Sequence, residues 1–113
     1  GTLIFDEIDA GVGGSVADRV GALMRRLGRD RQVLCVTHLP QVAACADAQC
    51  VVSKAVRGSA TESEVRPVTG DARTGEIARM LGGSAGEARL AHARALLDAA
   101  QAPEGASPAR RRA

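Results

Sequence analysis

Two short apolar runs that end abruptly in polar residues constrain the fold of this chain more than any other feature. The first run covers residues 3–5 and is followed directly by Asp6 and Glu7. The second covers residues 33–36, within a strand predicted over 32–36, and ends just before Thr37 and His38. Short continuous apolar runs are typical of strands that are buried on both faces of a parallel sheet. The chain is therefore expected to contain at least two such strands.

Helical segments are predicted to alternate with these strands. Residues 15–27 are predicted to form a helix because apolar side chains recur at helical spacing, namely Val16, Val20, Leu23 and Leu27. A second, short helix is predicted over 41–46, since Pro40 suits the first helical turn. The order strand, helix, strand, helix predicts an α/β fold with a mostly parallel sheet flanked by helices.

The second half of the chain predicts a hairpin and two more helices. Strands over 50–55 and 64–68 are expected to flank a polar loop at 57–63, with Pro67 on an edge strand. Helices are predicted over 76–81 and 87–100, the latter with one face formed by Leu90, Ala93 and Leu97. Residues 1–101 therefore form the predicted domain. Residues 102–113, rich in Pro, Gly, Ser and Arg, form a predicted disordered tail.

Composition and charge limit the classes of protein to which the chain can belong. The net charge of +2 leaves acids and bases nearly balanced, so the chain has no overall electrostatic footprint for nucleic acid. Three cysteines without a secretory signal indicate reduced thiols and a cytosolic location. No apolar run is long enough to cross a membrane. Since the chain begins at Gly1 inside an apolar pattern, we expect it to be a piece of a longer protein.

Asp6, Glu7 and His38 are the residues most suited to chemistry. The carboxyl ends of parallel strands meet at one edge of a sheet, where ligands bind. Adjacent strand residues point to opposite sides, so one carboxylate could bind Mg²⁺ beside a phosphate while the other orients a water molecule. An imidazole at the end of the next strand could contact the same phosphate or water.

Other interpretations of these residues remain open. The acids could mark a strand that simply ends in a solvated loop. With Asp9, Asp47 and Asp71, they could form the carboxylate cluster of a metal-dependent nuclease or phosphatase. The fold could also be a non-catalytic dimerisation module.

A zinc site is a separate possibility for the cysteines. It would comprise Cys35, His38, Cys45 and Cys50, but their spacing lacks the usual paired pattern. We interpret the three cysteines as small buried apolar residues.

Taken in order, these motifs resemble those of ABC-type ATPases. The segment TLIFDEIDAGVGG (2–14) resembles a Walker B strand and D-loop, and VLCVTHLPQVAA (33–44) resembles a switch-histidine strand. THLPQVA is similar to the RecN family of SMC-like ATPases, as are the later segments EIARMLGG and ARLAHARALL. The resemblance covers about residues 2–97 and is weakest over 53–74.

The resemblance implies a fold, a function and roles for particular residues. The fold would be the C-terminal lobe of a P-loop (ABC-type) ATPase head that acts in DNA double-strand break repair and recombination. Asp6 would bind the Mg²⁺ of MgATP, Glu7 would polarise the hydrolytic water, and His38 would contact the γ-phosphate. Asp9 would belong to a D-loop that lies across a head-to-head homodimer interface. DNA would be bound through the full-length protein, in the cytoplasm at the nucleoid and without a membrane.

Motifs that such an ATPase also needs are missing from these 113 residues. The sequence contains no Walker A loop of the form G-x-x-x-x-G-K-[ST], and it lacks the family's Q-loop glutamine and signature helix. A Walker A loop supplies the backbone cradle and the lysine that hold the phosphates. We therefore expect the N-terminal ATPase lobe of the same protein as a partner, and no ATP hydrolysis by this chain alone.

Overall fold

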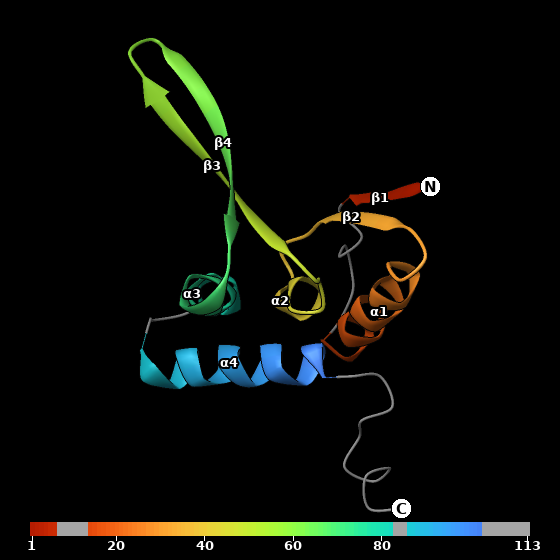
Figure 1. The fold of residues 1–113 in the computed structure, drawn as a ribbon. Coiled ribbons are helices and arrows are strands. Elements are labelled where there is room, and N and C mark those ends of the chain that lie inside the picture. Colours follow the sequence, from red (N-terminus) through yellow and green to blue (C-terminus); the bar gives the residue numbers. More distant parts are fainter. Residues whose placement is uncertain (7–13, 83–85, 103–113) are drawn as a thin grey trace, which may run out of the picture.

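The computed structural model describes residues 1–6, 14–82 and 86–102. Its elements are, in chain order, β1 (Thr2–Asp6), α1 (Gly14–Leu27), β2 (Gln32–Val36), α2 (Pro40–Ala43), β3 (Gln49–Arg57), β4 (Ala60–Val68), α3 (Gly70–Leu81) and α4 (Glu87–Gln101). In Figure 1, α1 lies beneath β1 and β2, α4 runs under α2 and α3, and the β3–β4 hairpin projects away from the helices. The α/β class predicted from the sequence is confirmed. Of the predicted tail, only Ala102 lies within the described residues.

The strands form two separate two-stranded sheets, one parallel and one antiparallel. In the parallel sheet, β1 and β2 pair from Thr2 with Gln32 to Asp6 with Val36. Exposed and half-buried residues alternate along both strands, and Ile4 and Val36 on the exposed face are 71% and 62% exposed. The prediction that both faces are buried is therefore wrong for the described part of the chain, which covers one face only.

Helix α1 packs through its smallest residues rather than through its large apolar ones. Ala17 is 1% exposed and Gly21 is buried, whereas Val16 and Leu23 of the predicted core stripe are 46% and 55% exposed. A Cβ atom added to Gly21 would stand 2.7 Å from the sulfur of Cys45. Val20 and Leu27 of the predicted stripe are half-buried, so the stripe is wrong only for Val16 and Leu23. The small residues let α1 approach the α2 segment closely, which turns part of the larger face outward.

The described core is built largely from alanine. Five buried residues form it, with five half-buried ones packed around them: Ala43, Ala44, Ile77, Ala78 and Ala93, then Met80, Leu81, Leu96, Leu97 and Ala100. Ile77 is the largest fully buried side chain in the described residues. Leu90, predicted on the same face of α4 as Ala93, is 40% exposed. Small side chains bury little apolar area each, so this core alone stabilises the fold modestly.

The turn that follows α2 is held by side chains from three other helices. Arg25 of α1 donates to the carbonyl of Cys45 at 2.9 Å. Arg73 of α3 and Gln101 of α4 each donate to the carbonyl of Ala46 at 2.7 Å. Cys45 and Ala46 lie after Ala43, the last residue of α2, so their carbonyls take hydrogen-bond partners from outside that helix. This network therefore joins α1, α3 and α4 around a helix of only four residues.

The hairpin is longer and its turn tighter than predicted. Arg57 pairs with Ala60, so the connection consists of Gly58 and Ser59 alone and not of residues 57–63. Gly58 has φ 62°, a left-handed conformation that glycine adopts without steric cost. Pro67 lies on β4, an edge strand as predicted, because this sheet has only two strands among the described residues.

Helix α3 begins earlier than predicted, at Gly70 instead of residue 76, with the acid Asp71 in its first turn. It ends before Gly82, whose φ is 80°, and Arg89 of α4 donates to the carbonyl of Leu81 at 2.9 Å. Helix α2 ends three residues before its predicted end, and α4 extends one residue past its predicted end. None of the helices in the described segments has the length and apolar character needed to cross a bilayer.

Candidate functional site

The register of the parallel sheet places Asp6 and the segment after β2 at one edge. Asp6 is the last residue of β1 and pairs with Val36, the last residue of β2. Thr37 and His38 follow directly after β2, so both strands end at the same edge of the sheet. Asp6 and His38 are both exposed there. Glu7 and Asp9, the other predicted site residues, lie outside the described residues.

Local hydrogen bonding determines how the chain leaves β2. The hydroxyl oxygen of Thr37 accepts the backbone N–H of Leu39 at 3.0 Å, a short turn typical of threonine. Leu39 is extended, with φ −89° and ψ 117°, and Pro40 begins α2 at a position that needs no N–H donor. This turn holds His38 between the end of the sheet and the start of a helix, where its backbone position is fixed.

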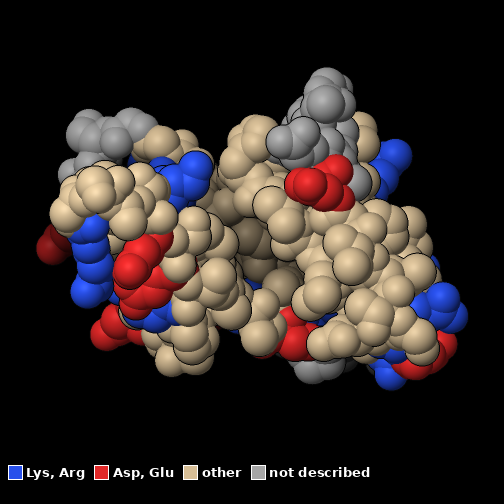
Figure 2. All heavy atoms as spheres, turned by 90° about the horizontal axis from the view of Figure 1, so that it is seen from above, with Lys and Arg blue, Asp and Glu red and all other residues tan. Residues whose placement is uncertain are grey.

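A large groove opens beside this edge and separates the two sheets. Its volume is about 1070 Å³, and its lining includes Thr37 and His38. Figure 2 shows the hollow from above, between the hairpin side and the parallel-sheet side of the molecule, with walls made mainly of uncharged residues.

Both walls of the groove carry exposed apolar side chains. On the β2 side these are Leu34 and Val36, which are 48% and 62% exposed. On the hairpin side they are Val52 and Val65, a directly paired couple that are 66% and 63% exposed. Apolar surface gathered in one place on a folded protein usually marks an interaction site. The groove therefore joins the candidate site to an uncovered apolar surface.

The remaining acids proposed for a carboxylate cluster lie elsewhere in the fold. Asp47 forms an ion pair with Arg25 at 3.3 Å, and Asp71 lies in the first turn of α3. Across residues 1–6, 14–82 and 86–102, no three His, Cys, Asp or Glu side chains form a group that could hold a metal ion. Asp6 alone offers one hard oxygen ligand, which is sufficient for Mg²⁺ when phosphates and water supply the rest.

The three cysteines have different environments. Cys45 is buried, Cys35 is half-buried and Cys50 is exposed, so the interpretation of all three as buried is wrong for Cys50. Cys50 lies on the hairpin, and its strand has no second layer over it in the described part of the chain. Burial raises the pKa of the Cys45 thiol, against opposing effects of Arg25 and Arg73.

A comparison with solved structures shows which known fold the chain shares. A structure described as "Structural biochemistry of ATP-driven dimerization and DNA stimulated activation of SMC ATPases" has a similar fold, with a TM-score of 0.57 and 19% sequence identity. The similarity covers 74% of this chain and 50% of that chain. The fold is therefore that of part of an SMC-type ATPase. No family model matches the sequence.

Curated relatives resemble the chain more closely in sequence. The chain is 49% identical over 100 residues to the DNA repair protein RecN of Vibrio cholerae, which covers 88% of the chain and 18% of the relative. It is 50% identical over 102 residues to RecN of Streptomyces coelicolor and 52% identical over 96 residues to RecN of Deinococcus radiodurans. By sequence, the chain is similar to a segment of these RecN proteins. It spans less than a fifth of the length of these relatives.

Proposed function

We propose that this chain supplies part of the ATP site of a RecN-like DNA repair ATPase. The observation that carries the proposal is the parallel register of β1 and β2, in which Asp6 pairs with Val36 two residues before His38. An acid and an imidazole from neighbouring strands thus share the sheet edge where α/β proteins bind ligands. The names of the curated relatives support the DNA repair role, and the SMC neighbour supports ATP as the nucleotide.

Each proposed site residue has a distinct role. Asp6 would hold the Mg²⁺ of MgATP, which neutralises charge on the phosphates when bound. Glu7 would orient and polarise the attacking water, and His38 would donate a hydrogen bond to the γ-phosphate. Asp9 would reach across the interface between two heads. ATP held between two such heads would favour the closed homodimer, and its hydrolysis would shift the population towards open heads.

The groove beside the site is the proposed binding site for the N-terminal lobe of the same protein. Strand β2 pairs with β1 along one edge, and no described strand pairs with its other edge. A strand inserted between β2 and the hairpin would cover Leu34, Val36, Val52 and Val65 and bring a phosphate-binding loop to His38. The chain spans less than a fifth of its relatives, so ample sequence exists in them for such a lobe. DNA contacts and a nucleoid location would belong to the whole protein.

The test uses a full-length protein that carries this segment. Glu7→Gln and His38→Ala are expected to lower ATP turnover by about 100-fold or more while ATP binding persists, since both act in the chemical step. Asp6→Asn should weaken the Mg²⁺ dependence of binding. The matched control is Asp30→Asn, an exposed acid at the opposite end of β2, which should leave turnover unchanged. Normal turnover in Glu7→Gln would overturn the proposal, as would measurable hydrolysis by the isolated 113-residue chain.

A further inference from the structure

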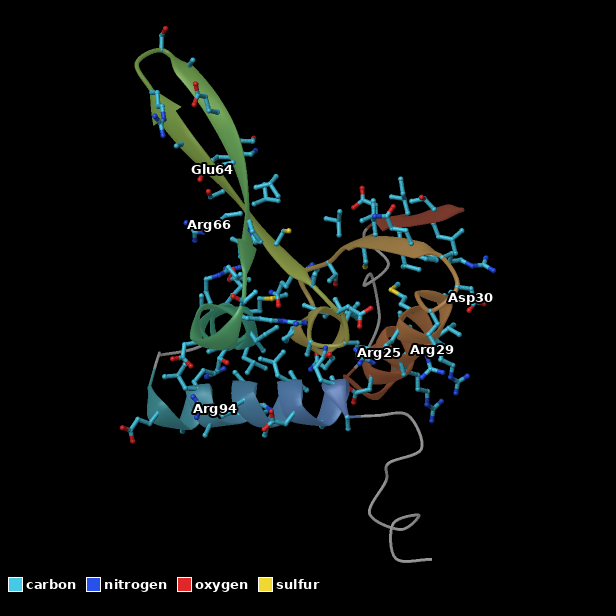
Figure 3. All side chains as sticks on the ribbon, in the orientation of Figure 1. Arg25, Arg29, Asp30, Glu64, Arg66 and Arg94 are labelled. Carbon is cyan, nitrogen blue, oxygen red and sulfur yellow. The ribbon has the colours of Figure 1, made fainter. Side chains whose placement is uncertain are left out.

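A second groove, separate from the proposed nucleotide edge, lies between α1 and the C-terminal part of α4. Its volume is about 420 Å³. One face of α1 with the turn that follows it and one face of α4 form most of its lining: Asp18, Ala22, Arg25 and Arg26 on α1, Arg29 in the turn after α1, and Leu96, Ala99 and Ala100 on α4. Figure 3 shows Arg25 on α1 and Arg29 just after α1 near this end of α4, with Arg94 farther along α4.

The α1 side of this groove is basic. Three guanidinium groups face it, against the carboxylate of Asp18 in the groove and that of Asp47, which pairs with Arg25 at 3.3 Å. Arg25 is fixed by hydrogen bonds to the Cys45 carbonyl at 2.9 Å and to the Gln101 side chain of α4 at 3.0 Å. It therefore bridges the two helices and holds their separation, while Arg26 and Arg29 are exposed. Guanidinium groups bind carboxylates in a planar, two-bonded geometry that favours recognition.

The α4 side of the groove is apolar and shallow. Leu96 and Ala100 are half-buried and Ala99 is exposed, with Ala22 exposed on α1. Small side chains let the backbone of a guest approach closely, and Leu96 gives its apolar side chains a contact. An apolar floor beside a basic wall fits a segment with apolar residues on one side and acids on the other.

We propose that this groove binds an acidic, amphipathic peptide segment of a partner protein. An apolar side chain of the segment would lie on Leu96 and Ala99, and its carboxylates would pair with Arg26 and Arg29. Docking of an amphipathic helix into a groove is a common mode of peptide recognition. The groove is distinct from the described part of the proposed ATP site, because neither Asp6 nor His38 lines it.

Charge and composition favour a peptide over the other candidate occupants. Phe5 is the only aromatic residue in the chain, so the groove offers no aromatic ring on which bases could stack. Residues 103–113 of this chain carry three arginines against Glu104 and would be repelled by a basic wall. An acidic peptide segment needs no aromatic partner, is attracted by the arginines, and can place apolar side chains on the floor of the groove.

Fluorescence anisotropy with a short labelled peptide, with leucines at helical spacing and Asp or Glu between them, tests the proposal. The double variant Arg26→Glu, Arg29→Glu is expected to weaken binding about tenfold or more, because it places like charges together. Ala99→Trp should weaken it by filling the floor without a change of charge. Arg94→Glu reverses one charge in the same way at an exposed position on α4 outside the groove, and should alter affinity less than about twofold. Circular dichroism of each variant confirms that the helices are retained.

Several outcomes would overturn the proposal. One is failure of the wild-type chain to bind the peptide. Another is equal binding of a peptide in which serine replaces leucine, which would show a simple anion site. A third is a single-stranded oligonucleotide that displaces the peptide and loses affinity in the same variants, which would assign the groove to nucleic acid. In the full-length protein, the double variant should retain ATP hydrolysis, so failure of this proposal is distinguishable from failure of the ATPase proposal.

Discussion

Gly21 of α1 lies so close to Cys45 that no side chain fits between them. A Cβ atom at Gly21 would stand 2.7 Å from the Cys45 sulfur and 3.1 Å from the carbonyl oxygen of Gln41. In a helix interior, glycine costs about 1 kcal/mol relative to alanine. Glycine is nevertheless required at this position because the contact between Gly21 and Cys45 sets the distance between α1 and the segment that follows β2.

The substitution Gly21→Ala is therefore expected to destabilise the chain despite its better helix propensity. Overpacking of this kind costs about 1–3 kcal/mol, which outweighs the gain in propensity. Adding Cys45→Ala should recover part of the loss, since the sulfur is removed while the Gln41 carbonyl stays. Urea denaturation of the two single variants and the double variant measures the coupling.

Gly75 provides the matched control for this experiment. It lies within α3, is exposed, and has no atom within 4 Å of an added Cβ. Gly75→Ala should therefore stabilise the chain by up to about 1 kcal/mol. If Gly21→Ala stabilised the protein as much as Gly75→Ala does, the close packing of α1 on Cys45 would be disproved.

A second prediction concerns Arg73, which caps α2 from α3. Its guanidinium donates to the carbonyls of Ala43 and Ala46 and to the side chain of Gln49, at 3.2, 2.7 and 3.0 Å. Burial and the nearby Arg25 lower its pKa, but an arginine stays charged in proteins. Arg73→Met removes three hydrogen bonds, although Ala46 keeps Gln101 as a donor and Ala43 keeps the N–H of Ala46, and should cost about 1–2 kcal/mol in unfolding free energy.

Arg57 serves as the control for Arg73. Its side chain is 71% exposed and pairs across the hairpin with Glu62, which is 62% exposed. A surface ion pair contributes at most about 1 kcal/mol, so Arg57→Met should shift the denaturation midpoint less than Arg73→Met. Equal losses of stability in the two variants would show that the hydrogen bonds of Arg73 around α2 contribute no more than a surface ion pair does.

Stability should fall at alkaline pH because of Cys45. Burial raises the pKa of this thiol above its ordinary 9.0 in the folded chain. Below that value the thiol is neutral in both states, and as pH rises through it the unfolded chain ionises first, which favours unfolding. The absence of tyrosine and the presence of only one lysine leave few other groups that titrate there. Urea midpoints at about pH 8 and about pH 10 should differ more in the wild type than in Cys45→Ala.

The sequence predicted the strands and helices where side-chain type decides the backbone. Strand β2 has the predicted bounds, because an uninterrupted apolar run between polar residues leaves little choice. The first turns of α3 were missed because Gly70 and Gly75 are poor helix formers, and the acid in its first turn, Asp71, was the available signal. The tight turn at Gly58 was missed because a polar loop and the tip of a longer hairpin have the same composition.

Packing between elements could not be predicted in the same way. Periodicity shows that α1 is amphipathic, but Ala17 and Gly21 are buried only because α2 approaches that face. Similarly, the apolar pattern of β2 predicts a covered strand, and it holds no information on which chain segment provides the cover. At the candidate site, the sequence placed Asp6 and His38 at one edge from strand order alone, whereas the groove beside them depends on where the hairpin lies.

The proposed binding of the N-terminal lobe in the groove between the two sheets can be tested in a way that separates folding from association. Val52 and Val56 lie on the same face of β3, are 66% and 74% exposed, and differ in that only Val52 lines the groove. A change from valine to threonine keeps the shape and adds a hydroxyl. Because both residues are exposed, neither Val52→Thr nor Val56→Thr should change the stability of the chain by more than about 0.5 kcal/mol.

The affinity for the proposed N-terminal lobe should fall when Val52 is replaced and should stay almost unchanged when Val56 is replaced. If a strand of the N-terminal lobe covers the groove, the Val52 hydroxyl would be buried without a partner at a cost of about 1–3 kcal/mol, which is roughly 5- to 150-fold in affinity. Val56→Thr should bind the lobe almost as the wild type does. Titration of the separately produced lobe, followed by calorimetry, measures the difference. Equal affinities for the two variants would mean that the groove stays open to solvent in the assembled head, and the apolar walls would then need another explanation.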